Sequence, residues 1–242
     1  MIRIEGLSKS FGKVEAIRDV SFSAADQRIT ALLGPNGAGK STTLRILSTV
    51  ITADSGTASV GGCDIASEPM AVRGEIGVLP HATGLYERLT ARENIRYYGE
   101  LHGLKGTALR DRVEQLIQDL EIEAFADRRV KGFSQGQRIK VALARALVHD
   151  PGHLILDEPT NGLDVMATRA LRELILKLRD EGRCILFSSH VMQEVANLCE
   201  DVVVIGGGQV RFQGTLDELI ASTGHNNLED AFVASLGDSA HE

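Results

Sequence analysis

Four short stretches of the chain are almost continuously apolar, and the segments between them repeat their apolar residues at helical spacing. The four stretches are RITALLG (28–34), HLILDEP (153–159), RCILFSSH (183–190) and DVVVIGGG (201–208). Continuous apolar character is typical of strands that are buried on both faces of a parallel sheet. The helical patterns cover residues 42–50, 134–148, 165–180 and 191–199. This alternation predicts an α/β fold built on a parallel sheet.

Two regions depart from this alternation. The first 30 residues and the segment VVVIGGGQVRFQG (202–214) have the pattern of strands joined by turns, which predicts an antiparallel β element beside the parallel core. Residues 84–150 contain one helical pattern after another and no clear strand. We therefore expect one domain over residues 1–242. Residues 1–83 and 151–242 would form the core with its β element, and residues 84–150 an inserted helical subdomain.

Composition narrows the class of protein. The chain has 242 residues, a net charge of −7 and 43% hydrophobic residues, and its acidic balance argues against nucleic acid as the main partner. The three cysteines have no CxxC spacing, which favours a cytosolic protein with reduced thiols. The start MIRIEG does not resemble a secretion signal, and no apolar run approaches the ~18 residues of a membrane span.

The stretch GPNGAGKST (34–42) fits the phosphate-loop pattern G-x-x-x-x-G-K-[ST], and it lies between a predicted strand and a predicted helix. In such loops the backbone amides surround the phosphates at the positive end of the helix dipole. A glycine-rich turn without a ligand is the alternative, which the strand–loop–helix context disfavours. Lys40 would neutralise phosphate charge, Ser41 would bind Mg²⁺, and Gly37 and Gly39 would allow close approach. The candidate nucleotide-binding residues of the loop are Gly34, Pro35, Asn36, Gly37, Ala38, Gly39, Lys40, Ser41 and Thr42.

Acidic residues and a histidine end two of the predicted strands, at the edge where doubly wound folds bind ligands. Asp157 would hold Mg²⁺, together with Ser41, and Glu158 would act as general base toward the attacking water. Two acids after a strand are also common as helix caps, so the pair becomes catalytic only beside a phosphate loop. His190 would contact a γ-phosphate or the attacking water, with a structural histidine as the alternative.

The stretch FSQGQ (133–137) combines a helix start with a poor helix former. Ser134 and Gln137 have capping-box spacing before the apolar-periodic run RIKVALARALV. Gly136, inside the first turn, weakens a helix. A cap alone does not explain this glycine.

With these motifs in this order, the chain resembles the nucleotide-binding subunits of ATP-binding-cassette (ABC) transporters. The resemblance covers essentially the whole chain and rests on residues 34–42, FSQGQ as a variant of the signature L-S-G-G-Q, LILDEP (154–159), NGLD (161–164) and His190. It implies a P-loop NTPase core, the cofactors ATP and Mg²⁺, and ATP hydrolysis. It also implies that Phe11 stacks on adenine; a core phenylalanine is the alternative.

In this family two subunits pair head to tail, and each signature covers the ATP held by the other. The resemblance therefore implies that Ser134, Gly136 and Gln137 lie at the partner's ATP, with Gly136 letting the backbone approach the phosphate. Gln135 replaces the usual first glycine of the signature. Residues 161–164 would connect the two sites. Because one chain carries every part, a homodimer with two sites is expected.

One position departs from the family pattern. After the segment IGVLP (76–80) the family usually has a glutamine that contacts Mg²⁺ and senses the membrane partner, whereas this chain has His81. Histidine has a shorter reach, which puts direct metal contact in doubt. The segment that follows holds Tyr86, Tyr97 and Tyr98, and aromatic residues are enriched at interfaces. We expect residues 84–98 to meet a separate membrane permease; packing inside the helical subdomain is the alternative.

The segment TGLYERLTARENI (83–95) resembles ATPases of ABC-2-type exporters, most of all the sodium-extruding group. NNLEDAF (226–232) predicts a short amphipathic helix with Leu228, Ala231, Phe232 and Leu236 on its apolar face. We expect a motor subunit bound to the inner face of the plasma membrane through its permease. Sodium is the candidate cargo, and drugs, lipids or polysaccharides are alternatives. Two other classes of protein are the rivals. One is a soluble ABC ATPase without a permease, which usually has zinc CxxC pairs, coiled-coil insertions or two cassettes. The other is a P-loop kinase, which would lack FSQGQ and His190.

Overall fold

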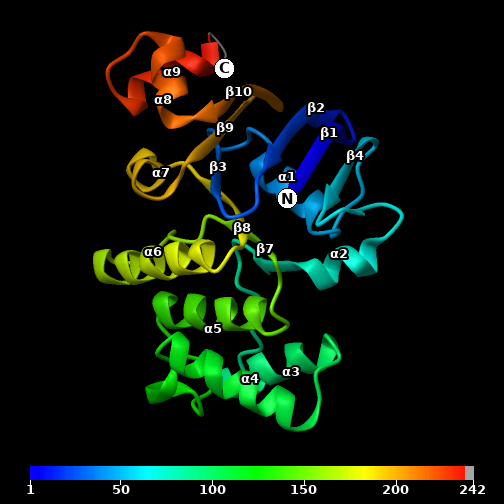
Figure 1. Cartoon of the computed structure of the whole chain (residues 1–242), viewed down its shortest axis with the longest axis vertical. Coiled ribbons are helices and arrows are strands. Elements are labelled where there is room, and N and C mark those ends of the chain that lie inside the picture. The colour runs from blue at the N-terminus through cyan, green and yellow to red at the C-terminus, as the bar shows by residue number, and fades with distance from the viewer. Residues whose placement is uncertain (238–242) are drawn as a thin grey trace.

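The computed structural model describes residues 1–237, which form two sheets and a set of covering helices (Figure 1). The first is a 4-stranded antiparallel sheet with the order β2-β1-β4-β5. The second is a 6-stranded sheet with the order β10-β9-β3-β8-β7-β6, in which all pairings are parallel except that of β9 with β10. The strands are β1 (Ile2–Phe11), β2 (Val14–Ala24), β3 (Ile29–Leu33), β4 (Ser55–Val60), β5 (Cys63–Asp64), β6 (Ile76–Leu79), β7 (His153–Asp157), β8 (Cys184–Ser189), β9 (Asp201–Gly206) and β10 (Gln209–Thr215).

The predicted α/β fold is confirmed. The four continuous apolar stretches form β3, β8, β7 and β9, and nearly all their residues are buried. Successive residues of β3 point to opposite sides: Ala31 and Leu33 join the apolar core on the helical side, and Leu32 joins the core toward the antiparallel sheet. A strand that is buried on both faces cannot alternate apolar with polar residues, which explains the continuous pattern.

Helices connect the strands, and several of them cover the second sheet (Figure 1). They are α1 (Lys40–Leu47), α2 (Pro69–Glu75), α3 (Ala91–Leu101), α4 (Gly106–Asp119), the 3₁₀ turn η1 (Glu123–Phe125), α5 (Gln135–Leu147), α6 (Val165–Asp180), α7 (Met192–Leu198), α8 (Leu216–Thr223) and α9 (Leu228–Leu236). Of these, α3 and α4 pack on α5 instead. The predicted amphipathic helix near the end of the chain is α9, with Ala231 and Leu236 buried. No helix within residues 1–237 is long and apolar enough to cross a membrane.

The elements from α3 to α5 lie between β6 and β7 in the chain, although these two strands are neighbours in the sheet. In Figure 1 they form one end of the molecule, and β1, β2 and β4 lie beyond the opposite side of the sheet. This arrangement agrees with an inserted helical subdomain, whose limits at residues 84 and 150 stay a prediction. Helix α5 packs against α3 and β6, so the FSQGQ helix joins the insertion to the core.

Candidate active site

The phosphate loop connects the end of β3 to the start of α1. Its backbone has left-handed φ values at Gly37 (82°) and Gly39 (105°), which favour glycine at both positions. Gly39 is the N-cap of α1 and has no side chain to satisfy the first amides of the helix. Unpaired amides at a helix start attract anions, and phosphate is the anion that such loops bind.

The two glycines have different surroundings. A Cβ on Gly39 would lie 2.5 Å from Cγ2 of Ile17 and 2.8 Å from the carbonyl oxygen of Ala16, so β2 packs directly on this part of the loop. A Cβ on Gly37 would meet no heavy atom within 4 Å. Gly39 is thus required by the protein's own packing, whereas the side of the loop at Gly37 is open to a ligand.

Lys40 lies inside this loop and is only 5% exposed. Its ammonium group donates hydrogen bonds to the carbonyl oxygens of Gly34 (2.6 Å) and Pro35 (3.1 Å). Burial lowers the pKa of Lys40, and the negative charges of Glu158 and Asp157 act in the opposite direction. Burying a cation costs free energy, and carbonyl oxygens alone offset only part of that cost. An anion bound at the same loop would therefore stabilise the charged form of Lys40.

Ser41 and Asp157 form a pair of oxygen donors beside the loop. The Ser41 hydroxyl donates to Oδ1 of Asp157 over 3.2 Å, and the Ser188 hydroxyl donates to the same oxygen over 2.7 Å. Mg²⁺ prefers hard oxygen ligands, and it is commonly held by one or two carboxylates together with substrate phosphates and water. The hydroxyl and carboxylate beside a phosphate loop therefore fit the ion predicted from the sequence.

Glu158 lies at the centre of the expected catalytic group. Its backbone has a left-handed φ of 49°, a conformation that costs energy for a non-glycine residue and is often found at functional sites. Its amide donates to the hydroxyl of Ser188 over 3.0 Å. Its carboxylate is 3.1 Å from Nδ1 of His190 through Oε1 and 3.8 Å from Nδ1 of His81 through Oε2.

The structure therefore brings together the strand-end residues that the sequence singled out. His190 is a partner of Glu158, which the sequence analysis did not foresee, because it directed this ring at phosphate or water. The approach of His81 to Glu158 was also missed. A cavity of about 60 Å³ lined by His81, Asp157 and Glu158 lies beside the carboxylate, and its size suits a water molecule.

The predicted capping box of the FSQGQ helix is confirmed. The Ser134 hydroxyl accepts from the Gln137 amide (3.2 Å), and Oε1 of Gln137 accepts from the Ser134 amide (3.1 Å). A Cβ on Gly136 would lie 3.6 Å from Cβ of Ala167 and 3.8 Å from Cδ2 of Leu163. These are ordinary contacts, so the chain's own packing does not require a glycine here.

The polar side chains of the FSQGQ stretch contact parts of their own chain that lie outside the phosphate loop. Gln135 lies against Gly162 and lines the cavity beside Glu158. Within residues 1–237 the side chains of Ser134 and Gln137 hydrogen-bond only with their own helix end and not with the phosphate loop. A role of the signature at phosphate thus needs a second chain.

Phe11 ends β1, just before the tight turn to β2, and it is 51% exposed. The ammonium group of Lys9 lies 5.7 Å from its ring centroid. This exposure excludes the alternative of a core phenylalanine and leaves a ring face available for stacking. Phe11 pairs with Val14 of β2, and β2 in turn packs on Gly39 of the phosphate loop.

A groove of about 1000 Å³, here named the β6 groove, runs from the site along β6. Its polar and aromatic lining includes Arg45, Arg73, His81, Tyr98, Arg145 and His149. The guanidinium of Arg145 is buried, lies 4.7 Å from the ring centroid of Tyr98 and donates to the Gly84 carbonyl over 3.3 Å. Among residues 1–237 no carboxylate is within ion-pair distance of it, and burial lowers the pKa of Arg145.

The three tyrosines differ in exposure. Tyr86 and Tyr97 are 48% and 39% exposed and form an edge-to-face pair with centroids 5.4 Å apart. Tyr98 packs against the apolar core, next to Arg145. The expected interface segment is therefore split: Tyr86 and Tyr97 face outward, and Tyr98 has the internal position given as the alternative.

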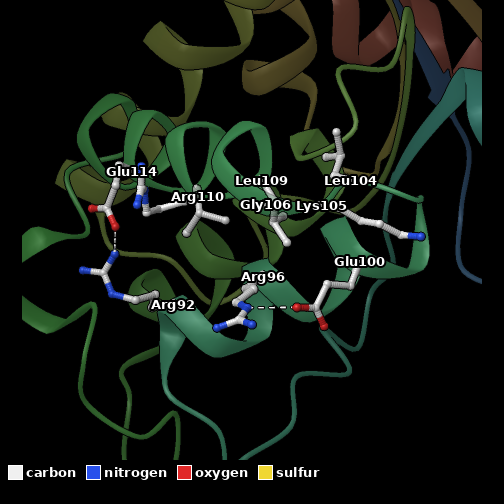
Figure 2. Close-up of a pocket in the computed structure, with 10 residues that line it drawn as sticks. Arg92, Arg96, Glu100, Leu104, Lys105, Gly106, Leu109, Arg110 and Glu114 are labelled. Atoms are coloured by element: carbon white, nitrogen blue, oxygen red, sulfur yellow. Dashed lines mark hydrogen bonds and ion pairs between the residues drawn. The ribbon is translucent and has the colours of Figure 1, made fainter.

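A second groove, of about 700 Å³, lies between α3 and α4 (Figure 2). Arg92 pairs with Glu114, and Arg96 pairs with Glu100 over 2.9 Å, as the dashed lines of Figure 2 mark. Arg110, the third arginine of the lining, lies 3.5 Å from Asp111, so each of these arginines has an acid beside it. None of the predicted site residues lines this groove, which lies in the helical end of the molecule.

Comparison with known proteins agrees with this site. The family model described as "ABC transporter" matches residues 17–161. The chain is 42% identical over 224 residues to the "ABC transporter ATP-binding protein NatA" of Bacillus subtilis, which covers 92% of this chain and 91% of that protein. It is 32% identical over 249 residues to the "Linearmycin resistance ATP-binding protein LnrL" of the same organism, covering 100% of this chain and 80% of the relative.

Solved structures agree as well. One described as "Structure of ATP binding subunit of ABC transporter" superposes with a TM-score of 0.89 at 29% identity, covering 97% of this chain and 99% of the other. The "Dimeric Structure of MJ0796, a Bacterial ABC Transporter Cassette" gives a TM-score of 0.82 at 25% identity, covering 89% and 99%. Motifs, site geometry, family match and fold agree, and the chain belongs to the ABC transporter family as an ATP-binding and ATP-hydrolysing subunit.

Proposed function

We propose that this chain is the motor of an ABC-2-type exporter, working as a homodimer on a separate permease at the inner face of the plasma membrane. The observation that carries the catalytic part is the position of Glu158, held by His190 beside Lys40, Ser41 and Asp157. The exporter part is supported by relatives named for linearmycin resistance and Nod factor export.

In this proposal Glu158 accepts a proton from the attacking water, and Lys40 with the loop amides binds the phosphates. Mg²⁺, held by Ser41 and Asp157, would neutralise charge on the phosphate oxygens. If His190 donates from Nδ1 to Glu158, Nε2 of the neutral ring is an acceptor. A neutral His190 then orients the base and accepts from water, whereas donation to a phosphate oxygen requires the protonated ring.

The signature acts on the ATP of the second subunit. Among residues 1–237 the side chains of Ser134 and Gln137 make no hydrogen bond to their own phosphate loop, and the packing around Gly136 does not require glycine. The test is complementation between two inactive variants, Ser134→Arg and Lys40→Ala. Each variant alone should lack ATPase activity, and an equal mixture should regain part of it, because mixed dimers contain one intact composite site.

A silent mixture would also result if two active sites are required per dimer. A crosslink settles that case: if a photoreactive side chain at position 134 labels ATP bound to the Lys40 of its own chain, the head-to-tail arrangement is wrong. Labelling of the other chain's ATP supports it.

The permease is proposed to dock on Tyr86, Tyr97 and the β6 groove. The groove carries the buried guanidinium of Arg145, which has no carboxylate within ion-pair distance among residues 1–237, and it ends at His81, which lies near Glu158. A permease segment with an acidic residue would complete the pairing of Arg145. A shift of His81 on docking would change the surroundings of the base without moving the phosphate loop.

Sodium is the proposed cargo, on the likeness of residues 83–95 to ATPases of sodium-extruding transporters. Drug export is the second candidate, favoured by the relatives named for linearmycin and daunorubicin resistance. The test uses proteoliposomes that contain the subunit with its permease. ATP-dependent sodium flux, abolished by Glu158→Gln, supports the first candidate; drug accumulation without sodium flux supports the second.

A further inference from the structure

Two adjacent serines end β8, and each hydrogen-bonds to a carboxylate. The Ser188 hydroxyl joins Asp157 to the backbone of Glu158 within the catalytic group. The Ser189 hydroxyl makes a parallel set of bonds outside it: it donates to Oε2 of Glu194 over 3.2 Å and accepts from the Val191 amide over 3.0 Å. The catalytic group as described makes no use of this second set.

Glu194 lies in the first turn of α7 and receives a second hydroxyl. Thr160 donates from Oγ1 to the same Oε2 atom over 2.5 Å. Thr160 follows Glu158 by two positions and precedes the segment 161–164, which ends in the N-cap of α6. Ser189 directly precedes His190. Oε2 of Glu194, which is partly buried, therefore hydrogen-bonds both to Ser189, the residue before His190, and to Thr160, in the loop that follows Glu158.

The geometry points to Glu194 as a positioning residue for hydrolysis. We propose that Glu194 sets the position of His190 relative to Glu158 and fixes residues 160–164, which the proposed dimer places at the second site. The inference rests on the proposed role of Glu158 and adds a residue that acts through its hydrogen bonds with Thr160 and Ser189. Hydrogen bonds to an ionised group are about twice as strong as neutral ones, so this oxygen is an effective anchor.

An ordinary explanation exists for an acid at this position. A glutamate in the first turn of a helix is stabilised by the helix dipole, and this alone would hold α7 in place. The interaction with the helix dipole, however, needs neither the Thr160 nor the Ser189 hydroxyl. Removal of the Thr160 hydroxyl, which is not part of α7, therefore distinguishes the two explanations.

The test compares Glu194→Ala, Glu194→Gln, Thr160→Val and the double variant Thr160→Val/Glu194→Ala in the full chain. Gln193→Ala, at the exposed neighbouring position of α7, is the matched control. The measurements are kcat and KM for ATP, together with the melting temperature. Glu194→Ala should lower kcat by about tenfold to a hundredfold, the range for a misplaced catalytic group, with KM for ATP changed less than about twofold.

Glu194→Gln should recover part of the lost rate, because its amide oxygen can still accept one hydroxyl. Thr160→Val should lower kcat, and the double variant should be no slower than Glu194→Ala, because both changes break the same bond. The inference is wrong if kcat is unchanged in Thr160→Val, if the two losses add, or if KM rises while kcat stays constant.

A loss confined to melting temperature would also overturn it, since that outcome belongs to the dipole explanation. Should Glu194→Ala not fold, Thr160→Val and Ser189→Ala carry the same comparison. Glu158→Gln keeps the two proposals distinct. If Glu158→Gln is inactive while Glu194→Ala and Thr160→Val turn over normally, only the role of Glu194 fails.

Discussion

Nδ1 of His190 lies 3.1 Å from Oε1 of Glu158, so the imidazole of His190 orients the carboxylate that is expected to act as the base. Glu158→Gln keeps the shape of the side chain but removes the proton acceptor. We expect the variant to bind ATP and to lose at least about a hundredfold in hydrolysis, because a general base contributes roughly 10²–10⁴-fold. Size-exclusion chromatography with ATP should show an accumulated dimer.

The matched control for this variant is Glu173→Gln, an exposed acid on α6 that pairs with Arg169. It should hydrolyse ATP at the normal rate. Turnover of Glu158→Gln above about a tenth of the wild-type rate would contradict the assignment of the base, given the range for general bases.

Gly136→Ala separates the fold of one subunit from the composite site. Alanine is favoured over glycine in helices by up to about 1 kcal/mol, and the added Cβ has room in the single chain. The melting temperature should therefore stay the same or rise, while ATPase activity falls because the backbone no longer reaches the partner's phosphate. Gly152→Ala, whose Cβ would also have space, should keep full activity. A fully active Gly136→Ala would remove this glycine from the site.

His81 offers a test of coupling to the permease. His81→Gln restores the residue usual in the family and should keep or raise ATPase activity. His81→Ala removes the group 3.8 Å from Glu158 and should mainly weaken stimulation of turnover by the permease. The measurement is ATPase rate with and without permease in detergent or proteoliposomes. Normal stimulation of the alanine variant would exclude His81 from coupling.

Tyr86 and Tyr98 form a matched pair for the docking surface. Truncation of an interface aromatic commonly costs ~2 kcal/mol or more, roughly a thirtyfold loss of affinity. Tyr86→Ala should leave melting temperature and basal ATPase unchanged, yet weaken co-purification with the permease and abolish transport. Tyr98→Ala should instead lower the melting temperature, because its ring packs against the apolar core. A fall of several degrees in the melting temperature of Tyr86→Ala would show that this ring stabilises the fold of the subunit. If Tyr86→Ala still binds the permease normally, the docking surface lies elsewhere.

His149 makes the stability of the subunit sensitive to acid. Burial lowers its pKa to about 4, and the stacked His102 ring, 3.6 Å away, and Arg112 act in the same direction, against the Ile76 carbonyl and Asp150. Between pH 6.5 and 4 the unfolded chain therefore binds a proton that the folded chain does not. We therefore expect the free energy of unfolding to keep its full His149 contribution above about pH 6.5 and to fall as the pH drops toward 4, by up to ~1.4 kcal/mol per pH unit.

His149→Gln should flatten this dependence, since glutamine keeps a donor for the Ile76 carbonyl and does not titrate. Melting temperatures at pH 7.5, 6.5 and 5.5 give the comparison, with His225→Gln, at an exposed position, as control. An equal loss of stability with falling pH in wild type and His149→Gln would show that other groups are responsible.

The parallel core was predictable because β3, β7, β8 and β9 are buried on both faces and therefore apolar throughout. β4 was not, because half of its residues are exposed in the short polar stretch SGTASV. Lys40, Asp157, Glu158 and His190 could be grouped in advance, because the carboxyl ends of parallel strands meet at one edge. The contact of His81 with Glu158 depends on the path of the loop after β6. The hydrogen bond between Thr160 and Glu194 depends on the placement of α7. Neither path has a local sequence signal.

Strands β6 and β7 pair from Ile76 with His153 to Leu79 with Leu156, and residues 80–152 lie between them in the chain. Closing so long a loop costs conformational entropy, whereas the local contacts of α3, α4 and α5 form early during folding. β6 also lies at the edge of its sheet. We therefore expect β6 to dock late and to open first, with faster amide hydrogen exchange than β3. The strand that ends beside His81 is then anchored more weakly than the central strand β3, so the connectivity of the chain itself supplies mobility where the permease is expected to act.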